Sequence, residues 1–187
     1  RPGERFIISV ARLSPEKRQK ALIEAIPHIP DNRIKLVLVG GGPYENELRM
    51  RAAELGVTGR VIFTGMQPSD KVASLLKQAD VFSLASYHFD NQPMTFLEAA
   101  SSGLPIVYCD EQMTEGLTER NSVLADGIEG EDLARAFNGL FSDPERLEQL
   151  SLGSLDVARD FDSTTMAERM VGLYESLIRD HRALPYR

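Results

Sequence analysis

Short runs of apolar, mostly β-branched residues alternate along the chain with longer stretches of helical periodicity. Six runs have the length and composition of buried strands, at 5–10, 34–39, 60–63, 80–84, 105–109 and 122–125. Seven stretches have helical patterns, at 16–27, 44–55, 69–78, 94–102, 131–141, 144–160 and 163–181. Strands that alternate with helices predict an α/β fold, with a parallel sheet of about six strands and helices on both faces.

The length and composition limit the class of protein. The 187 residues, without a composition break, predict one domain (1–187) with a helical tail at about 163–181. A net charge of −7 argues against a general nucleic-acid binder but allows a local site for a phosphate ligand. Apolar runs fall short of the ~20 residues of a membrane span. The chain starts at Arg1 rather than Met, so we treat it as a possible fragment.

Candidate metal ligands and thiols are few. Cys109 is the only cysteine and cannot form an internal disulfide, which is typical of a reducing compartment. The three histidines, His28, His88 and His181, are scattered without the spacing of a metal site. The sequence therefore predicts no metal.

Two loops that follow predicted strands carry residues that could bind phosphate. In parallel sheets, small molecules bind at the carboxyl ends of the strands, where these loops lie. Arg12 and Lys17 lie near the start of a helix, where the helix dipole disfavours cations unless an anion such as diphosphate is bound. The alternative is two solvated side chains. The GGGP turn at 40–43 fits a phosphate loop or a purely structural turn. Glu45 stands where a dinucleotide motif needs its third glycine, which disfavours nicotinamide binding.

Two carboxylates mark a third loop and the helix after it. Residues 94–100 read as a mostly buried helix, and Glu98 lies in the middle of it, where a carboxylate needs a partner. Helical side chains lean toward the helix N-terminus, so Glu98 is expected to point to the mouth of a site and suits two ribose hydroxyls. Asp90 precedes this helix. The alternative is that Glu98 caps a neighbouring loop and Asp90 lies at the surface. The loop at 64–68, which follows another predicted strand, could bind a base or be a simple turn.

At these residues the chain resembles a known family. The stretches VARLSPEK, LVLVGGGP, VIFTG and DNQPMTFLEAASSGLPIV occur in the order found in the C-terminal, donor-binding domain of GT-B fold retaining glycosyltransferases (family 4, glycosyl transferases group 1). The resemblance runs from about Ile8 to about Ala125. It implies a Rossmann-like domain that forms one half of a GT-B enzyme, with the acceptor-binding half absent. The tail helix at 163–181 would pack toward that half, dock on its own domain or stay undocked.

The resemblance also implies roles for individual residues. Arg12 and Lys17 would neutralise a diphosphate, and Asp90 would contact the sugar, so these three form the implied catalytic set. Glu98 would hold the ribose, and we expect Arg12, Lys17 and Glu98 to line one crevice. The implied donor-binding residues are Gly42, Met66, Gln67, Pro93, Met94, Thr95 and Glu98.

Some positions depart from the family pattern. Asp90 replaces the usual glutamate and is shorter by roughly 1.5 Å, the length of one C–C bond. Pro93 stands at a usual glycine position and has no N–H to donate. Ala11 and Arg18 also occupy positions where glycine is common. No role is carried onto the loop at 110–120, because the paired glycines of the family are missing there.

By this resemblance, the full enzyme would transfer a hexose from a nucleotide-sugar such as UDP- or GDP-hexose to an acceptor glycan or glycolipid, without a metal or other cofactor. A front-face mechanism is implied, with the leaving phosphate helping to deprotonate the acceptor. The fragment alone would bind donor without transferring sugar. We expect a cytoplasmic enzyme, with peripheral association at the inner face of the membrane. The alternative is a non-catalytic nucleotide-binding module of the same fold.

Overall fold

In a computed structural model, which describes residues 3–90 and 93–183, the six predicted strands form one sheet. All of its strand pairs are parallel, in the order β3-β2-β1-β4-β5-β6. The strands are β1 (Arg5–Val10), β2 (Ile34–Val39), β3 (Val61–Gly65), β4 (Val81–Ser83), β5 (Ile106–Tyr108) and β6 (Ser122–Leu124). The α/β, Rossmann-like prediction is confirmed, and each strand lies within a few residues of its predicted bounds.

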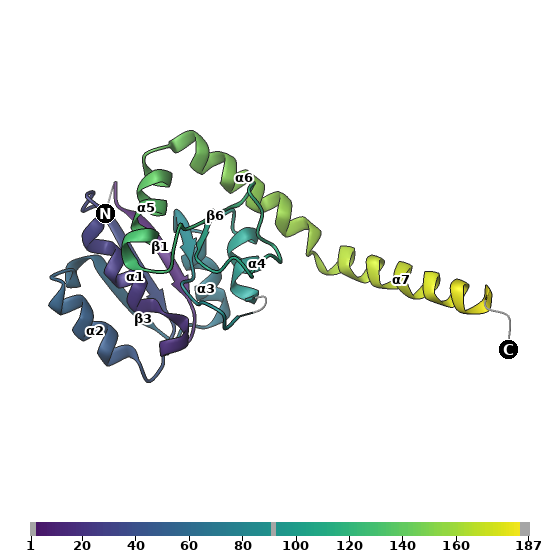
Figure 1. Cartoon of the computed structure of the whole chain (residues 1–187), viewed down its shortest axis with the longest axis horizontal. Helices are drawn as coiled ribbons and strands as arrows, with labels where there is room; N and C mark the ends of the chain where they lie inside the picture. The colour runs from purple at the N-terminus through teal and green to yellow at the C-terminus, as the bar shows by residue number, and fades with distance from the viewer. Residues whose placement is uncertain (1–2, 91–92, 184–187) are drawn as a thin grey trace.

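Helices cover both faces of this sheet (Figure 1). They are α1 (Gln19–Ala25), α2 (Glu45–Glu54), α3 (Ser69–Leu76), α4 (Met94–Ser101), α5 (Gly130–Phe141), α6 (Pro144–Asp160) and α7 (Ser163–Ala183). Successive strand residues point to opposite faces, so Ile7 packs with α1, α2 and α5, while Ile8 packs with α3 and α4. Because both faces are buried, the strands read as continuous apolar runs.

The prediction of one helix over 16–27 is wrong in detail. The segment consists of a 3-10 turn (Pro15–Lys17), helix α1 and a second 3-10 turn (Ile26–His28). Arg18 separates the first turn from α1 with a left-handed backbone, at φ 52° and ψ 28°. Its guanidinium Nη2 donates to the carbonyl of Ile128 at 2.8 Å, which ties this break to the loop before α5. Lys17 therefore ends a short turn instead of lying inside a helix.

Helix α7 extends away from the sheet and its covering helices, beyond the end of α6 (Figure 1). Its apolar side chains Met170, Leu173, Tyr174 and Leu177 are about half exposed. Packing of this helix toward an acceptor-binding half stays a prediction. Among the described residues, no helix combines the length and apolar character needed to cross a membrane.

The strand order reverses between β1 and β4, because β2 and β3 continue on one side of β1 while β4, β5 and β6 continue on the other. Ligands of such sheets bind in the crevice at the carboxyl ends of the strands beside this reversal. The loops that follow β1 and β4 border it, and they carry Arg12, Lys17 and Asp90.

Candidate active site

The loops after β1 and β2 are joined by their backbones at the carboxyl edge. The Leu13 amide donates to the Gly41 carbonyl at 3.1 Å, and the Tyr44 amide donates to the Leu13 carbonyl at 3.1 Å. Gly42 lies against this contact so closely that a Cβ there would come within 2.1 Å of the Leu13 carbonyl oxygen. The contacts of Gly42 thus support the structural-turn alternative, and its donor-binding role stays a prediction.

The N-terminus of α2, which follows this turn, already carries negative charge. Glu45 and Glu47 lie in its first turn, where they complement the helix dipole. An incoming phosphate would meet these carboxylates, so α2 is a poor anion site.

The loop after β1 is held in place by buried polar groups. Gln19 is 1% exposed, and its Nε2 donates to the carbonyl of Arg12 at 2.8 Å. The Arg12 side chain is exposed. The Ser14 hydroxyl donates to Glu16 at 2.6 Å, and this bond keeps the pKa of the Glu16 carboxyl below its usual value. Sequence reasoning missed Gln19, although a glutamine in the apolar pattern of 19–26 was a usable signal.

Lys17 and Asp90 meet across the reversal of strand order. Lys17 Nζ lies 2.5 Å from Asp90 Oδ1, and the two side chains are 18% and 14% exposed. The ammonium also lies 4.9 Å from the ring centre of Phe89, a cation–π distance. The other carboxylate oxygen, Oδ2 of Asp90, is buried and has no hydrogen-bond partner among the described residues. Two members of the implied catalytic set are therefore in contact.

Asp110, in the loop to which the sequence assigned no role, fixes the loop that leads to Asp90. It is 1% exposed, and its Oδ2 accepts from the His88 amide at 2.6 Å while its Oδ1 accepts from the Gln112 amide at 3.0 Å. His88 adopts a positive φ of 51° at this bond. An acid directly after the buried run 105–109, at the carboxyl edge, was the available signal.

Cys109 directly precedes Asp110, is 5% exposed, and has its Sγ 3.5 Å from the Ala85 carbonyl oxygen. Burial raises the pKa of its thiol to about 11, so the thiol stays protonated near neutral pH. A protonated, buried thiol is a poor nucleophile.

The N-terminus of α4 contrasts with that of α2. It has no acidic residue in its first turn, and the residue before it, Pro93, provides no side-chain cap. Within the described residues, the Met94 and Thr95 amides donate to no backbone carbonyl, whereas the next amide, of Phe96, donates to Pro93 at 2.9 Å. First-turn amides at the positive end of a helix dipole can bind an anion.

A groove of about 790 Å³ runs between α3 and α4. Gln67, Met94 and Glu98 line it together with apolar side chains of both helices. Glu98 is exposed, so the expectation of a buried carboxylate is wrong: Met94 and Glu98, one turn apart, share the open side of α4. Arg12 and Lys17 are not among the described residues that line this groove, and the prediction of one crevice for all three stays a prediction.

The loop after β3 borders this groove. The Gly40 amide donates to the Gly65 carbonyl at 3.0 Å, which joins it to the loop after β2. Gln67 Nε2 donates to the Thr64 carbonyl at 2.7 Å, while Met66 is 84% exposed. The base contacts of Met66 and Gln67 stay predictions.

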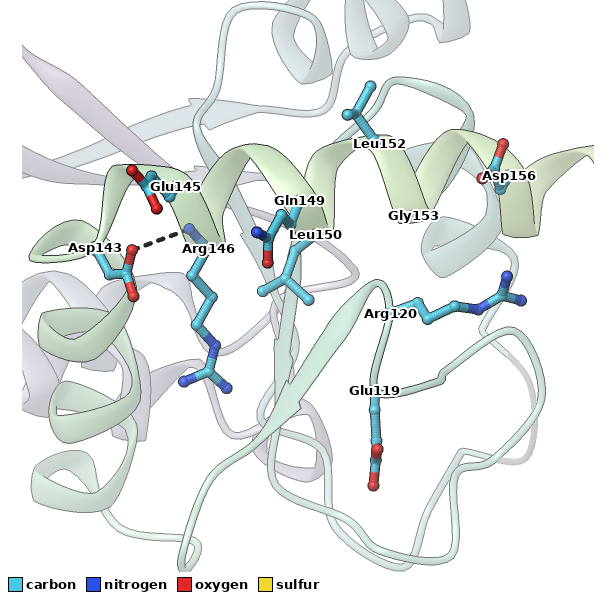
Figure 2. Close-up of a pocket in the computed structure, with 10 residues that line it drawn as sticks. All are labelled: Glu119, Arg120, Asp143, Glu145, Arg146, Gln149, Leu150, Leu152, Gly153 and Asp156. Atoms are coloured by element: carbon cyan, nitrogen blue, oxygen red, sulfur yellow. Dashed lines mark hydrogen bonds between the residues drawn. The ribbon is translucent and has the colours of Figure 1, made fainter.

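A second hollow of about 620 Å³ lies between α6 and the loop that precedes β6 (Figure 2). Its lining carries four carboxylates and two guanidiniums, on Glu119, Asp143, Glu145, Asp156, Arg120 and Arg146. Arg120 and Arg146 extend in different directions (Figure 2). The excess of negative charge and the position at the amino end of β6 make it unsuited to a nucleotide. Across the described residues, no group of three or more His, Cys, Asp and Glu is placed to hold a metal ion.

Solved glycosyltransferase structures share the fold of this chain. The crystal structure of Anabaena HepE in complex with UDP superposes with a TM-score of 0.84 at 24% identity, over 92% of this chain and 49% of that one. The catalytic domain of cholesterol-alpha-glucosyltransferase from Helicobacter pylori gives 0.73 at 25% identity, over 84% of this chain and 98% of that one. The predicted match to one half of a GT-B fold is confirmed.

Curated relatives are longer than this chain. The alpha-monoglucosyldiacylglycerol synthase of Streptococcus pneumoniae is 30% identical over 170 residues, which cover 90% of this chain and 35% of the relative. The GDP-mannose-dependent alpha-(1-6)-phosphatidylinositol monomannoside mannosyltransferase of Mycolicibacterium smegmatis is 30% identical over 174 residues, or 84% of this chain and 44% of that protein. The chain thus spans less than half the length of both.

The family model described as Glycosyl transferases group 1 matches residues 1–153. The match includes all six strands and every residue of the implied site. Since it covers most of the sequence, the chain belongs to the family of group 1 glycosyl transferases.

Proposed function

We propose that this chain is the donor-binding half of a retaining glycosyltransferase, which transfers a hexose from a nucleoside diphosphate to an acceptor hydroxyl. The observation that carries the proposal is the contact of Lys17 with Asp90 at the reversal of strand order. A lysine for phosphate and a carboxylate for sugar hydroxyls meet where the fold favours ligand binding. The names of the two 30% identical relatives, a synthase of a glucosylated lipid and a GDP-mannose-dependent enzyme, support a nucleotide-sugar donor.

The proposal implies a path for the donor over the surface of the domain. Its diphosphate would lie between Arg12, Lys17 and the first-turn amides of Met94 and Thr95, where the dipole of α4 favours negative charge. Its ribose would reach Glu98 in the groove between α3 and α4. The base would meet the adjoining loop at 64–68.

The chemistry rests on the leaving group. Negative charge develops on the diphosphate as the glycosidic bond breaks, and preorganised cations and amides stabilise it. The leaving phosphate accepts the proton of the acceptor hydroxyl on the same face of the sugar, so no protein nucleophile is used. The acceptor, a glycan or glycolipid, would be bound by a second half of the cleft beyond this chain.

The test is a thermal-shift and calorimetric comparison of UDP, GDP, ADP and their hexose forms. A ligand that binds the folded state raises its melting temperature. We expect one nucleotide to bind, and its hexose form to be turned over by a protein that also carries the acceptor half. Failure of all three nucleotides to bind would refute the proposal. Binding without turnover by that longer protein would favour a non-catalytic nucleotide-binding module instead.

A further inference from the structure

The contact between Lys17 and Asp90 creates a conflict within the proposed site. Lys17 has to neutralise a diphosphate, yet its ammonium already lies 2.5 Å from a carboxylate of opposite charge. Both side chains are more than four-fifths buried, so water screens their attraction less than at an open surface.

The pair also leaves one polar atom unsatisfied. Oδ2 of Asp90 is buried, and no described residue donates a hydrogen bond to it. A buried acceptor without a donor lowers stability, and native proteins rarely keep one that has no role. A hydroxyl group brought by a ligand would supply the missing donor.

We propose that Lys17 and Asp90 form an exchangeable ion pair whose partners separate on donor binding. The diphosphate, which carries more negative charge than one carboxylate, takes the Lys17 ammonium. The released Asp90 carboxylate accepts hydrogen bonds from hydroxyls of the hexose, and these satisfy Oδ2. After sugar transfer, Asp90 recovers Lys17 and promotes release of the nucleoside diphosphate. This inference rests on the proposed function.

The exchange makes Asp90 act differently on donor and product. The cost of breaking the ion pair lowers the affinity for the nucleotide-sugar and for the nucleoside diphosphate alike. Only the nucleotide-sugar offsets this cost, because its sugar hydroxyls donate hydrogen bonds to Asp90. Asp90→Asn should therefore bind the nucleoside diphosphate about three- to tenfold more tightly, the size of one partly screened charge interaction. The hexose form should gain less, because an amide is a weaker acceptor than a carboxylate.

The chain offers a matched control. Lys35 Nζ lies 2.7 Å from Glu4 Oε1, and these side chains are 20% and 14% exposed, close to the values for Lys17 and Asp90. Glu4 directly precedes β1, at the edge of the sheet opposite to the site. Glu4→Gln removes the carboxylate charge from this similarly buried pair and should leave nucleotide affinity unchanged.

The experiment measures the dissociation constants of UDP, GDP and ADP by calorimetry for the wild type, Asp90→Asn, Lys17→Ala, the double variant and Glu4→Gln. We expect Asp90→Asn to tighten binding of the preferred nucleotide, and this gain to fall below about twofold when Lys17 is already absent, as coupled residues require. Weaker binding by Asp90→Asn would mean that Asp90 only positions Lys17, and would overturn the exchange. An equal gain with and without Lys17 would indicate plain repulsion and would also overturn it. If the wild type binds none of the three nucleotides, the proposed function fails, and this inference with it.

Discussion

Replacing Gly42 with alanine tests whether the carboxyl edge depends on close contact between two loop backbones. The added Cβ would lie 2.1 Å from the Leu13 carbonyl oxygen and 2.7 Å from its carbonyl carbon. Both atoms belong to the backbone, so no side chain can rotate to make room. The loop at 40–43 has to move away from the loop after β1.

The size of the effect follows from that movement. A change from 2.1 Å to an ordinary contact of 3.4 Å requires a shift of about 1.3 Å. The Leu13–Gly41 and Tyr44–Leu13 hydrogen bonds, both 3.1 Å long, would not survive it. Two lost hydrogen bonds at about 1 kcal/mol each, with about 1 kcal/mol or more for overpacking, predict a loss of about 2–4 kcal/mol.

Urea unfolding of the wild type and the variant at 25 °C measures this loss as a lower midpoint with an unchanged slope. Gly139 provides the control, because it lies exposed in α5 and a Cβ there meets no atom within 4 Å. Gly139→Ala should stabilise the protein by about 0.5–1 kcal/mol, the helix preference of alanine over glycine. A Gly42→Ala variant within about 0.5 kcal/mol of the wild type, inside the range typical of neutral surface changes, would refute the close-contact reasoning.

Three further predictions concern the proposed site and the Cys109 thiol. Glu98→Gln should weaken ribonucleotide binding by about 1–2 kcal/mol and 2′-deoxynucleotide binding less, and equal losses in calorimetry would show that Glu98 does not contact the ribose. Replacing Arg12 and Lys17 together with alanine should weaken nucleoside diphosphate binding by about 2–4 kcal/mol while leaving the bare nucleoside unaffected, whereas an unchanged diphosphate affinity would make them ordinary surface cations. The pKa of Cys109 is raised to about 11 in the folded chain from a value of 9.0, so the unfolded chain loses this proton first and stability falls as pH rises from about 9 to 11. At about 1.4 kcal/mol per pH unit, the free energy of unfolding falls by roughly 2–3 kcal/mol over this pH range. Urea unfolding at each pH should show Cys109→Ala losing less stability over that range than the wild type, and parallel losses would contradict the raised pKa.

The sheet was predictable because its strands are buried on both faces and read as uninterrupted apolar runs. The break at Arg18 was not, because its left-handed backbone accompanies a hydrogen bond to Ile128, 110 residues away. Local periodicity contains no information about such a contact.

The motifs located the loops of the candidate site but not its contacts. Lys17 and Asp90 lie 73 residues apart, and their pairing depends on β1 and β4 being neighbours in the sheet. The apolar residues Phe96, Ala99 and Ala100 around Glu98 suggested a buried helix. They form the buried side of α4, whereas Glu98 lies on its exposed side. The roles of Gln19 and Asp110 were not predictable from the motifs, because their side chains bind main-chain groups of other loop residues.

The joined loops at the carboxyl edge have a consequence for how such a domain can diversify. Main-chain hydrogen bonds and a glycine contact fix their course, whereas the side chains of Arg12, Met66 and Met94 at the rim are exposed. Exchanging exposed side chains usually changes stability by less than about 0.5 kcal/mol. Substitutions at the rim can therefore accumulate without unfolding the framework beneath, so a change of ligand preference, in evolution or in the laboratory, need not wait for a compensating stabilising mutation.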